Sequence, residues 1–136
     1  MKVITKNDMG RTICEMDYDK ENNWIHAEWN GFANLEAIKS WGESYINLVE
    51  STKCPYFLND DRKSSGPWTS ALEWIESFLI PNAIANGVKY YAHVISESAF
   101  AALSSKELNN RIADVLEIGS FNNIEDAKKW LKENQS

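Results

Sequence analysis

Residues 88–95 form the segment that most restricts how this chain can fold. They read Val-Lys-Tyr-Tyr-Ala-His-Val-Ile, a run nearly continuous in β-branched and aromatic residues, and Asn86-Gly87 precedes them. A strand covered on both faces reads in this way, whereas a strand with one face in water alternates between apolar and polar residues. We therefore expect residues 88–95 to be the middle strand of a sheet.

The rest of the chain alternates between strand and helix periodicities. Residues 11–18 and 24–29 alternate as strands do and predict a β-hairpin, and shorter strands are expected at residues 56–58 and 115–118. Pro81 is expected to kink or end the helix before it. The expected helices are residues 33–50, 68–79, 98–103, 104–112 and 124–131.

This order, ββαβαβαβα, predicts an α/β fold in which right-handed crossovers make the later strands parallel. A length of 136 residues is too short for two ordinary domains, and no linker or repeat interrupts the pattern. Residues 1–136 are therefore expected to form one domain, a single mixed sheet covered by helices.

Charge and hydropathy exclude several classes of function. The net charge is −6, and no basic run is longer than Lys128-Lys129, so neither nucleic acid nor an anionic membrane surface is an expected partner. No apolar run approaches the roughly 20 residues that span a bilayer, and no signal segment is recognisable, so a cytoplasmic location is expected. The sequence predicts no cofactor, no metal site and no catalytic residue.

The segment after the strand at residues 56–58 is the candidate site, because α/β proteins place their sites at the carboxyl ends of strands. His93 lies near the same end of the predicted middle strand and could face this segment. The expected ligand-binding or partner-binding residues are Asn59, Asp60, Asp61, Arg62, Trp68, Thr69 and His93.

The charged residues of this segment allow more than one interpretation. Asp60 and Asp61 could bind a metal or act as acid and base, but adjacent carboxylates at a strand end more often cap nearby backbone N–H groups. Arg62 could balance these charges or hold an anionic ligand through two hydrogen bonds. Because no nucleophile with a base at a recognisable spacing is present, an enzyme is the third-ranked hypothesis.

The aromatic residues also leave alternatives open. Trp74 and Phe78 lie away from the apolar stripe of the helix at residues 68–79. They could be buried between the sheet and another helix, or form the surface of a homodimer or of a protein partner. A third hypothesis is a pocket for a small apolar ligand or lipid, lined by Trp68, Trp74, Phe78, Tyr90 and Tyr91.

Four segments together resemble a known family. They are Trp29-Asn30-Gly31-Phe32, Leu58-Asn59-Asp60-Asp61-Arg62 followed by Gly66-Pro67-Trp68, the run at residues 88–95, and the closing segment at residues 121–131. The chain resembles small bacterial STAS-like domains, which are related in fold to anti-sigma-factor antagonists and distantly to CRAL-TRIO lipid carriers.

The resemblance implies a STAS-like fold and a regulatory role. In regulatory members of the wider family, a serine at the start of a helix is phosphorylated and this controls docking to a partner, which a phosphate near free N–H groups explains. The corresponding candidates are Ser64, Ser65, Thr69 and Ser70. The leading expectation is a non-enzymatic protein-interaction module that forms a homodimer, and the alternative is a carrier of a small molecule or lipid.

Overall fold

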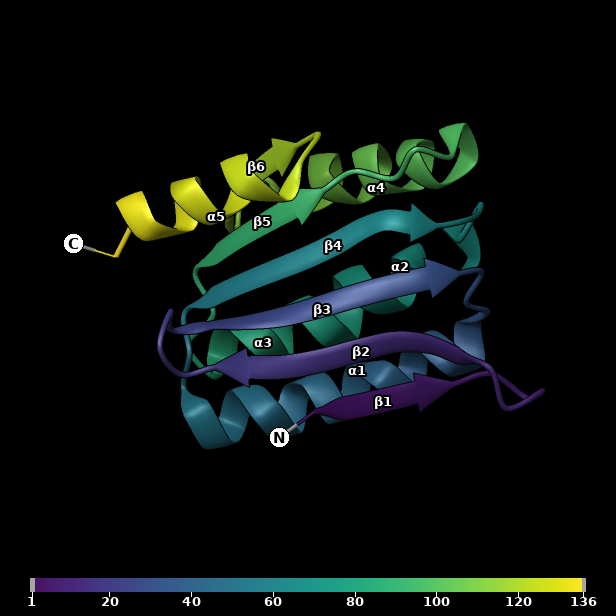
Figure 1. Ribbon diagram of the computed structural model, residues 1–136, viewed down its shortest axis with the longest axis horizontal. Helices are drawn as coiled ribbons and strands as arrows, with labels where there is room; N and C mark the ends of the chain where they lie inside the picture. The colour runs from purple at the N-terminus through teal and green to yellow at the C-terminus, as the bar shows by residue number, and fades with distance from the viewer. Residues whose placement is uncertain (1, 136) are drawn as a thin grey trace.

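Six strands form one mixed sheet, whose order across the sheet, β1-β2-β3-β4-β5-β6, is also their order along the chain. In the computed structural model, which describes residues 2–135, β1, β2 and β3 are antiparallel, and β3 to β6 are parallel (Figure 1). The predicted α/β class, mixed sheet and parallel later strands are confirmed. The strands are β1 (Val3–Lys6), β2 (Thr12–Asp19), β3 (Trp24–Gly31), β4 (Tyr56–Ser64), β5 (Tyr90–Val94) and β6 (Glu117–Phe121).

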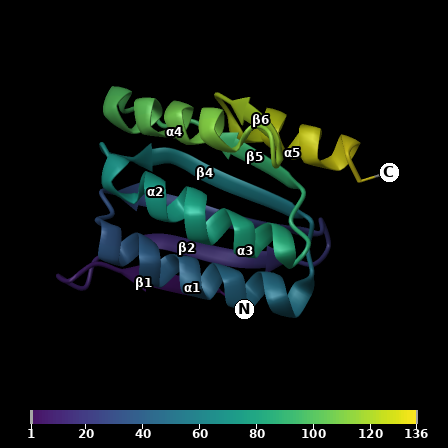
Figure 2. The same cartoon turned by 180° about the vertical axis from the view of Figure 1, so that it is seen from behind.

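Helices cover the two faces of the sheet unequally. Three helical units lie on one face, and α5 lies alone on the other, over the part of the sheet that holds β4 to β6 (Figures 1 and 2). The middle unit is a composite helix that changes from a 3-10 turn through α and π turns back to α. The helices are α1 (Leu35–Thr52), η1 (Thr69–Ala71), α2 (Leu72–Trp74), the π-helical η2 (Ile75–Leu79), α3 (Ile80–Ala85), α4 (Ala99–Ile112) and α5 (Ile124–Glu133).

Polar side chains fix where three of these helices begin. The side chains of Asn34, Ser98 and Asn123 each accept a hydrogen bond from a backbone N–H in the first turn of α1, α4 and α5. Such caps satisfy donors that the helix itself leaves unpaired. Lys53, in the left-handed conformation, ends α1 just before β4.

The apolar residues of β4 and β5 divide between two cores because successive side chains of a strand point to opposite faces. Phe57 and Tyr91 belong to the large core beneath α1, the composite helix and α4. Leu58 and Ala92 belong to the small core beneath α5, which Leu131 completes. A strand that contributes to two cores is apolar throughout, which explains the sequence of residues 88–95.

α1 and the composite helix approach each other closely at Gly42. A Cβ atom at Gly42 would lie 2.5 Å from Cη2 of Trp74, so only the absence of a side chain leaves room for the indole ring. Trp74 in turn stacks on Phe78 at 5.4 Å between ring centroids. The second apolar side of the composite helix therefore packs against α1 at Trp74, while Phe78 stays half exposed.

The strands differ from the prediction in three respects. β1 was not predicted, because it is a four-residue edge strand with only Thr5 buried. β4 continues to Ser64, so residues 59–64 belong to a strand and not to a loop. The strand β5 is not in the middle of the sheet but next to the edge strand β6. Its apolar sequence reflects burial under α4 and α5 and not a central position.

Two helix boundaries also differ. Residues 99–112 form one helix, α4, because Ser104 is not a cap: its Oγ accepts a hydrogen bond from the Trp68 N–H and donates to the Phe100 carbonyl. Pro81 does not end the composite helix, since it lies in the first turn of α3, directly after the π turn. A proline is tolerated there because its missing N–H is not required. None of the helices within residues 2–135 is long and apolar enough to cross a membrane.

Candidate functional site

A partly open cavity of about 70 Å³ lies between the sheet and the helices that cover its larger core. Its lining extends from Ser64 and Ser65, at the end of β4, to Val88 and Leu116, which precede β5 and β6. The lining therefore includes residues near both ends of the parallel strands. Its wall is mainly aromatic and aliphatic, and the large rings that line it are Trp29, Trp41, Tyr45, Phe57, Trp68 and Tyr91.

The aromatic wall is fixed by ring contacts. Trp41 stacks on Tyr45 at 5.2 Å and meets Trp29 edge to face at 5.0 Å between ring centroids. Phe57 stacks on Tyr91 at 5.3 Å. Such pairs hold their rings in defined orientations, so the wall is built largely in advance of any ligand.

A chain of hydrogen bonds crosses the floor of the cavity. The indole N–H of Trp29 donates to Asn59 Oδ1 at 2.8 Å, and Asn59 Nδ2 donates to the Tyr91 hydroxyl oxygen at 3.0 Å. Burial, and then the Asp61 carboxylate, raise the pKa of Tyr91 well above its usual value, so the hydroxyl keeps its hydrogen. Since the hydroxyl accepts from Asn59, its own hydrogen can be donated to another acceptor.

Trp41, a residue that lines the cavity, has a buried polar atom without a partner. Trp41 is only 4% exposed, so its indole Nε1 is shielded from water. This atom makes no hydrogen bond within residues 2–135. A buried donor without an acceptor costs about 1–3 kcal/mol. The chain supplies no acceptor for this donor within residues 2–135, and Trp41 is one of the residues that line the cavity.

Asp61 and His93 form a buried pair beside this cavity. Nε2 of His93 is in hydrogen-bond contact with Asp61 Oδ2, and His93 is completely buried. A carboxylate can only accept, so the hydrogen of this bond lies on Nε2. The predicted approach of His93 to the segment at residues 59–62 thus occurs, and Asp61 is the residue that it meets.

Ser105 lies close to this pair but does not complete a catalytic triad. Its Oγ is 3.4 Å from Nε2 of His93, the same nitrogen that binds Asp61. A triad needs the carboxylate on one ring nitrogen and the nucleophile on the other, so that the second nitrogen can take the serine proton. Here Nδ1 faces Asn109 Oδ1 at 3.4 Å, and Ser105 is completely buried. The geometry therefore describes a structural polar cluster and not an activated serine.

Asp60 and Arg62 lie on the opposite face of the sheet from Asp61. Both carboxylate oxygens of Asp60 accept hydrogen bonds from Arg62, at 3.0 Å from Nε and 2.7 Å from Nη2, and the Arg62 backbone N–H adds a third at 3.1 Å. Burial by itself would raise the pKa of Asp60, but these bonds to Arg62 outweigh it and lower the pKa. Asp60 thus accepts from a nearby backbone N–H, as expected of a cap, and is also paired with Arg62, whereas Asp61 is hydrogen-bonded to His93.

The hydroxyl groups proposed for phosphorylation fall into two groups. Ser64 is buried, and its Oγ donates to the Asp61 carbonyl at 2.9 Å. Ser65, Thr69 and Ser70 are exposed around the short η1 helix. Only these three hydroxyls can be reached from solvent in this conformation.

The predicted aromatic pocket is only partly the one that the structure shows. Trp68 and Tyr91 line the cavity, but Trp74 and Phe78 lie outside it, and Tyr90 faces α5. The prediction missed Trp41 and Tyr45, whose spacing of four residues on α1 places both on one helix face. The sequence alone can place Trp41 and Tyr45 on one helix face. Whether that face lines a cavity depends on how the helix packs.

A possible cation site lies on the face that α5 leaves open. His26, Glu28 and Asp60 place one ligand atom each within 4.8 Å of one another.

Comparison with models of known protein families and with curated proteins finds no match for this chain. The function is therefore inferred from the residues of the sites themselves.

Proposed function

We propose that this domain binds a small apolar molecule that carries a hydrogen-bond acceptor, and that it does so in the cavity between the sheet and the helices. The observation that carries the proposal is that Trp41, one of the aromatic residues that line the cavity, has a buried Nε1 without a partner. Ligand sites are mostly apolar, with a few polar groups that orient the ligand. The role is that of a carrier or sensor, because no residue of the wall is arranged for catalysis.

The size of the cavity limits the ligand. A volume of about 70 Å³ is roughly half that of an engineered cavity of about 150 Å³ that binds benzene. A ring-sized ligand therefore requires the wall to move, and a long acyl chain is excluded in this conformation. The π turn at Ile75–Leu79 contributes Ile75 and Leu79 to the wall, and such turns interrupt regular helix packing and recur at functional sites.

Two rings of equal size test the proposal. We expect pyridine, which has an acceptor nitrogen, to bind about fivefold more tightly than benzene at pH 7.5, because one hydrogen bond contributes about 1 kcal/mol. Trp41→Phe removes the N–H and should abolish this preference while benzene binding remains. The measurement is a titration of backbone amide chemical shifts for residues around the cavity.

Trp29→Phe is the matched control for Trp41→Phe. The Trp29 N–H already donates to Asn59, so its removal should leave the preference for pyridine in place. If neither ring shifts the amide resonances of cavity residues at millimolar concentration, the proposal is wrong. A preference that survives in Trp41→Phe would show that Trp41 is not the donor.

A second candidate function is recognition of a protein partner, as a regulatory module of the STAS-like type. Phe32, Phe100 and Leu103 are 51%, 64% and 64% exposed. They belong to the segments that follow β3 and β5, at the carboxyl ends of the parallel strands. The exposed Ser65 and Thr69 follow β4 at the same end of the sheet. Large apolar side chains on a surface favour association, and a phosphate among them would change the charge of that surface.

Self-association tests this second candidate. We expect the wild-type chain to sediment as a dimer at about 100 µM, and the double variant Phe100→Ser/Leu103→Ser to sediment as a monomer with an unchanged circular dichroism spectrum, because burial of two such side chains contributes about 3–6 kcal/mol. Val115→Ser removes another exposed apolar residue, just beyond the other end of α4, and should leave the dimer intact. A monomeric wild-type chain would contradict the homodimer.

A further inference from the structure

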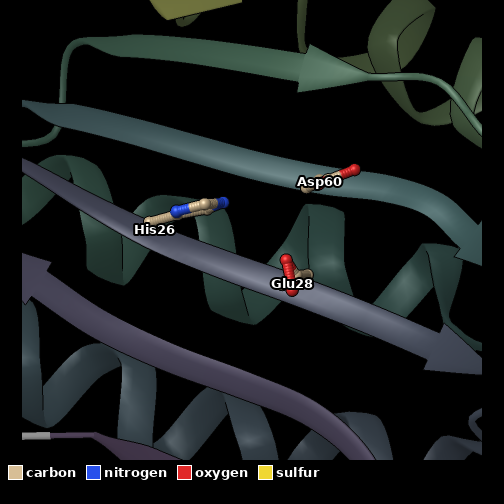
Figure 3. Close-up of side chains that lie close together, drawn as sticks. All are labelled: His26, Glu28 and Asp60. Carbon is tan, nitrogen blue, oxygen red and sulfur yellow. The ribbon is translucent and has the colours of Figure 1, made fainter. Parts of the chain in front are cut away.

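The sheet face opposite the cavity carries a group of metal-ligating side chains. α5 covers only part of this face, and the area over β2 and β3 has no helix on it (Figure 1). His26 and Glu28 are two residues apart on β3 and therefore share this face. Asp60 joins them because it is the register partner of Glu28 on β4. Figure 3 shows His26 leaning along β3 toward Glu28 and Asp60.

His26 is the unusual member of this group. Its Nε2 is buried and has no hydrogen-bond partner within residues 2–135. A neutral imidazole has one nitrogen with a free lone pair, and this is the form that binds metals.

The two carboxylates lie side by side across neighbouring strands. Like charges in this arrangement repel each other, and a cation between them removes the repulsion. Arg62 compensates Asp60 but occupies only one hydrogen-bonding position on Asp60 Oδ2. A carboxylate oxygen has two such positions, so Oδ2 can also bind a cation while Arg62 holds the carboxylate in place.

The charges around this group favour a cation. Glu15 and Asp17 are the register partners of Glu28 and His26 on β2, and they add negative charge to the same face. Two positively charged side chains near His26, Lys128 of α5 and Arg62, oppose this negative charge. Glu15 is paired with Lys2 at 3.2 Å, whereas the exposed Glu28 has a carboxylate oxygen within 4.8 Å of the ligand atoms of His26 and Asp60.

We propose that His26, Glu28 and Asp60 bind a divalent first-row transition-metal ion of the Zn²⁺ class, with water in the remaining coordination positions. One imidazole nitrogen with two carboxylates matches the ligands of zinc, whereas Mg²⁺ and Ca²⁺ prefer oxygen alone. Tetrahedral coordination brings ligand atoms to about 3.4 Å from one another, so the exposed Glu28 side chain must move inward on binding. Three protein ligands with an open position are the arrangement of a metal that can also bind a water or substrate.

The test is calorimetric titration of the untagged chain with ZnCl₂, with and without excess MgCl₂. We expect one Zn²⁺ per chain, a constant affinity in the presence of Mg²⁺, and at least tenfold weaker binding in His26→Ala and in Glu28→Gln. Zn²⁺ should also shift the Nε2 resonance of His26 in a ¹H–¹⁵N imidazole spectrum. Circular dichroism of each variant confirms that the fold is retained, and Glu28→Gln alters only an exposed side chain.

Glu15→Gln is the matched control, because it makes the same change on the same face, opposite Glu28, at a residue outside the proposed ligand set. It should weaken Zn²⁺ binding less than threefold. Loss of binding equal to that of Glu28→Gln would overturn the proposal, since the effect would then come from surface charge alone. Unchanged binding in His26→Ala, competition by Mg²⁺, or no saturable binding to the wild-type chain would also overturn it. The cavity lies on the other face, so these outcomes do not bear on ligand binding there.

Discussion

Replacement of Asp61 by alanine is expected to lower the free energy of unfolding by about 3–5 kcal/mol, the cost of removing one partner from a buried pair. The substitution leaves Nε2–H of His93, in a completely buried position, with no acceptor nearer than Ser105 Oγ at 3.4 Å. Asp61→Asn should cost only about 1–2 kcal/mol, because an amide oxygen still accepts this hydrogen bond but carries no charge. Urea unfolding followed by tryptophan fluorescence measures both values.

A double-mutant cycle separates the pair from its surroundings. Asp61→Ala combined with His93→Leu should be about 1–3 kcal/mol less destabilising than the sum of the two single changes, since the double variant leaves neither group unpaired. Asp114→Ala, at an exposed aspartate after α4, should stay within about 0.5 kcal/mol of the wild type. Additive effects at positions 61 and 93 would refute the coupling between the two side chains.

Phe57→Ala is expected to cost about 3–5 kcal/mol and at the same time to enlarge the ligand cavity. Phe57 is buried, lines the cavity and packs against both Tyr45 and Tyr91. Removal of its ring leaves a space that is continuous with the existing cavity. We therefore expect benzene to raise the melting temperature of the variant by several degrees more than that of the wild type, because a ligand that binds only the folded state stabilises it.

Leu58→Ala is the control for this effect. Leu58 is the neighbouring residue on the same strand, but it points into the small core beneath α5. Its replacement should cost about 2–5 kcal/mol without any gain in stabilisation by benzene beyond that of the wild type. Equal stabilisation of the two variants by benzene would mean that the ring does not bind in the cavity between the sheet and α1.

The prediction that residues 59–62 form a site stays a prediction, but the loop geometry assumed for this segment was wrong. It treated Asp60 and Asp61 as neighbours in a loop. In the structure they are successive residues of β4 and point to opposite faces, so Asp61 meets His93 while Asp60 joins Arg62. The polar sequence concealed the strand, because its polar side chains are satisfied by partners from other elements and not by water.

The residues that complete each site lie far apart in the sequence. Ser105 and Asn109 reach His93 from α4, and Trp41 reaches the cavity from α1. His26 belongs to no recognisable metal-ligand spacing in the sequence. Glu28 lies on the same face as His26 because side chains alternate along β3, which the sequence alone can show. Asp60 joins them through the register between β3 and β4, which a single sequence does not show.

The sequence by itself determined the elements of this protein: the hairpin, most of the later strands, the starts of the main helices and the α/β class. These follow from periodicity and capping, which act between residues close together in the chain. The tertiary structure alone decided that β5 lies next to the edge, that Asp61 pairs with His93, that a cavity remains under Trp41, and that His26 meets Glu28 and Asp60. The physical reason is that each of these depends on strand register and helix packing, which join residues distant in sequence.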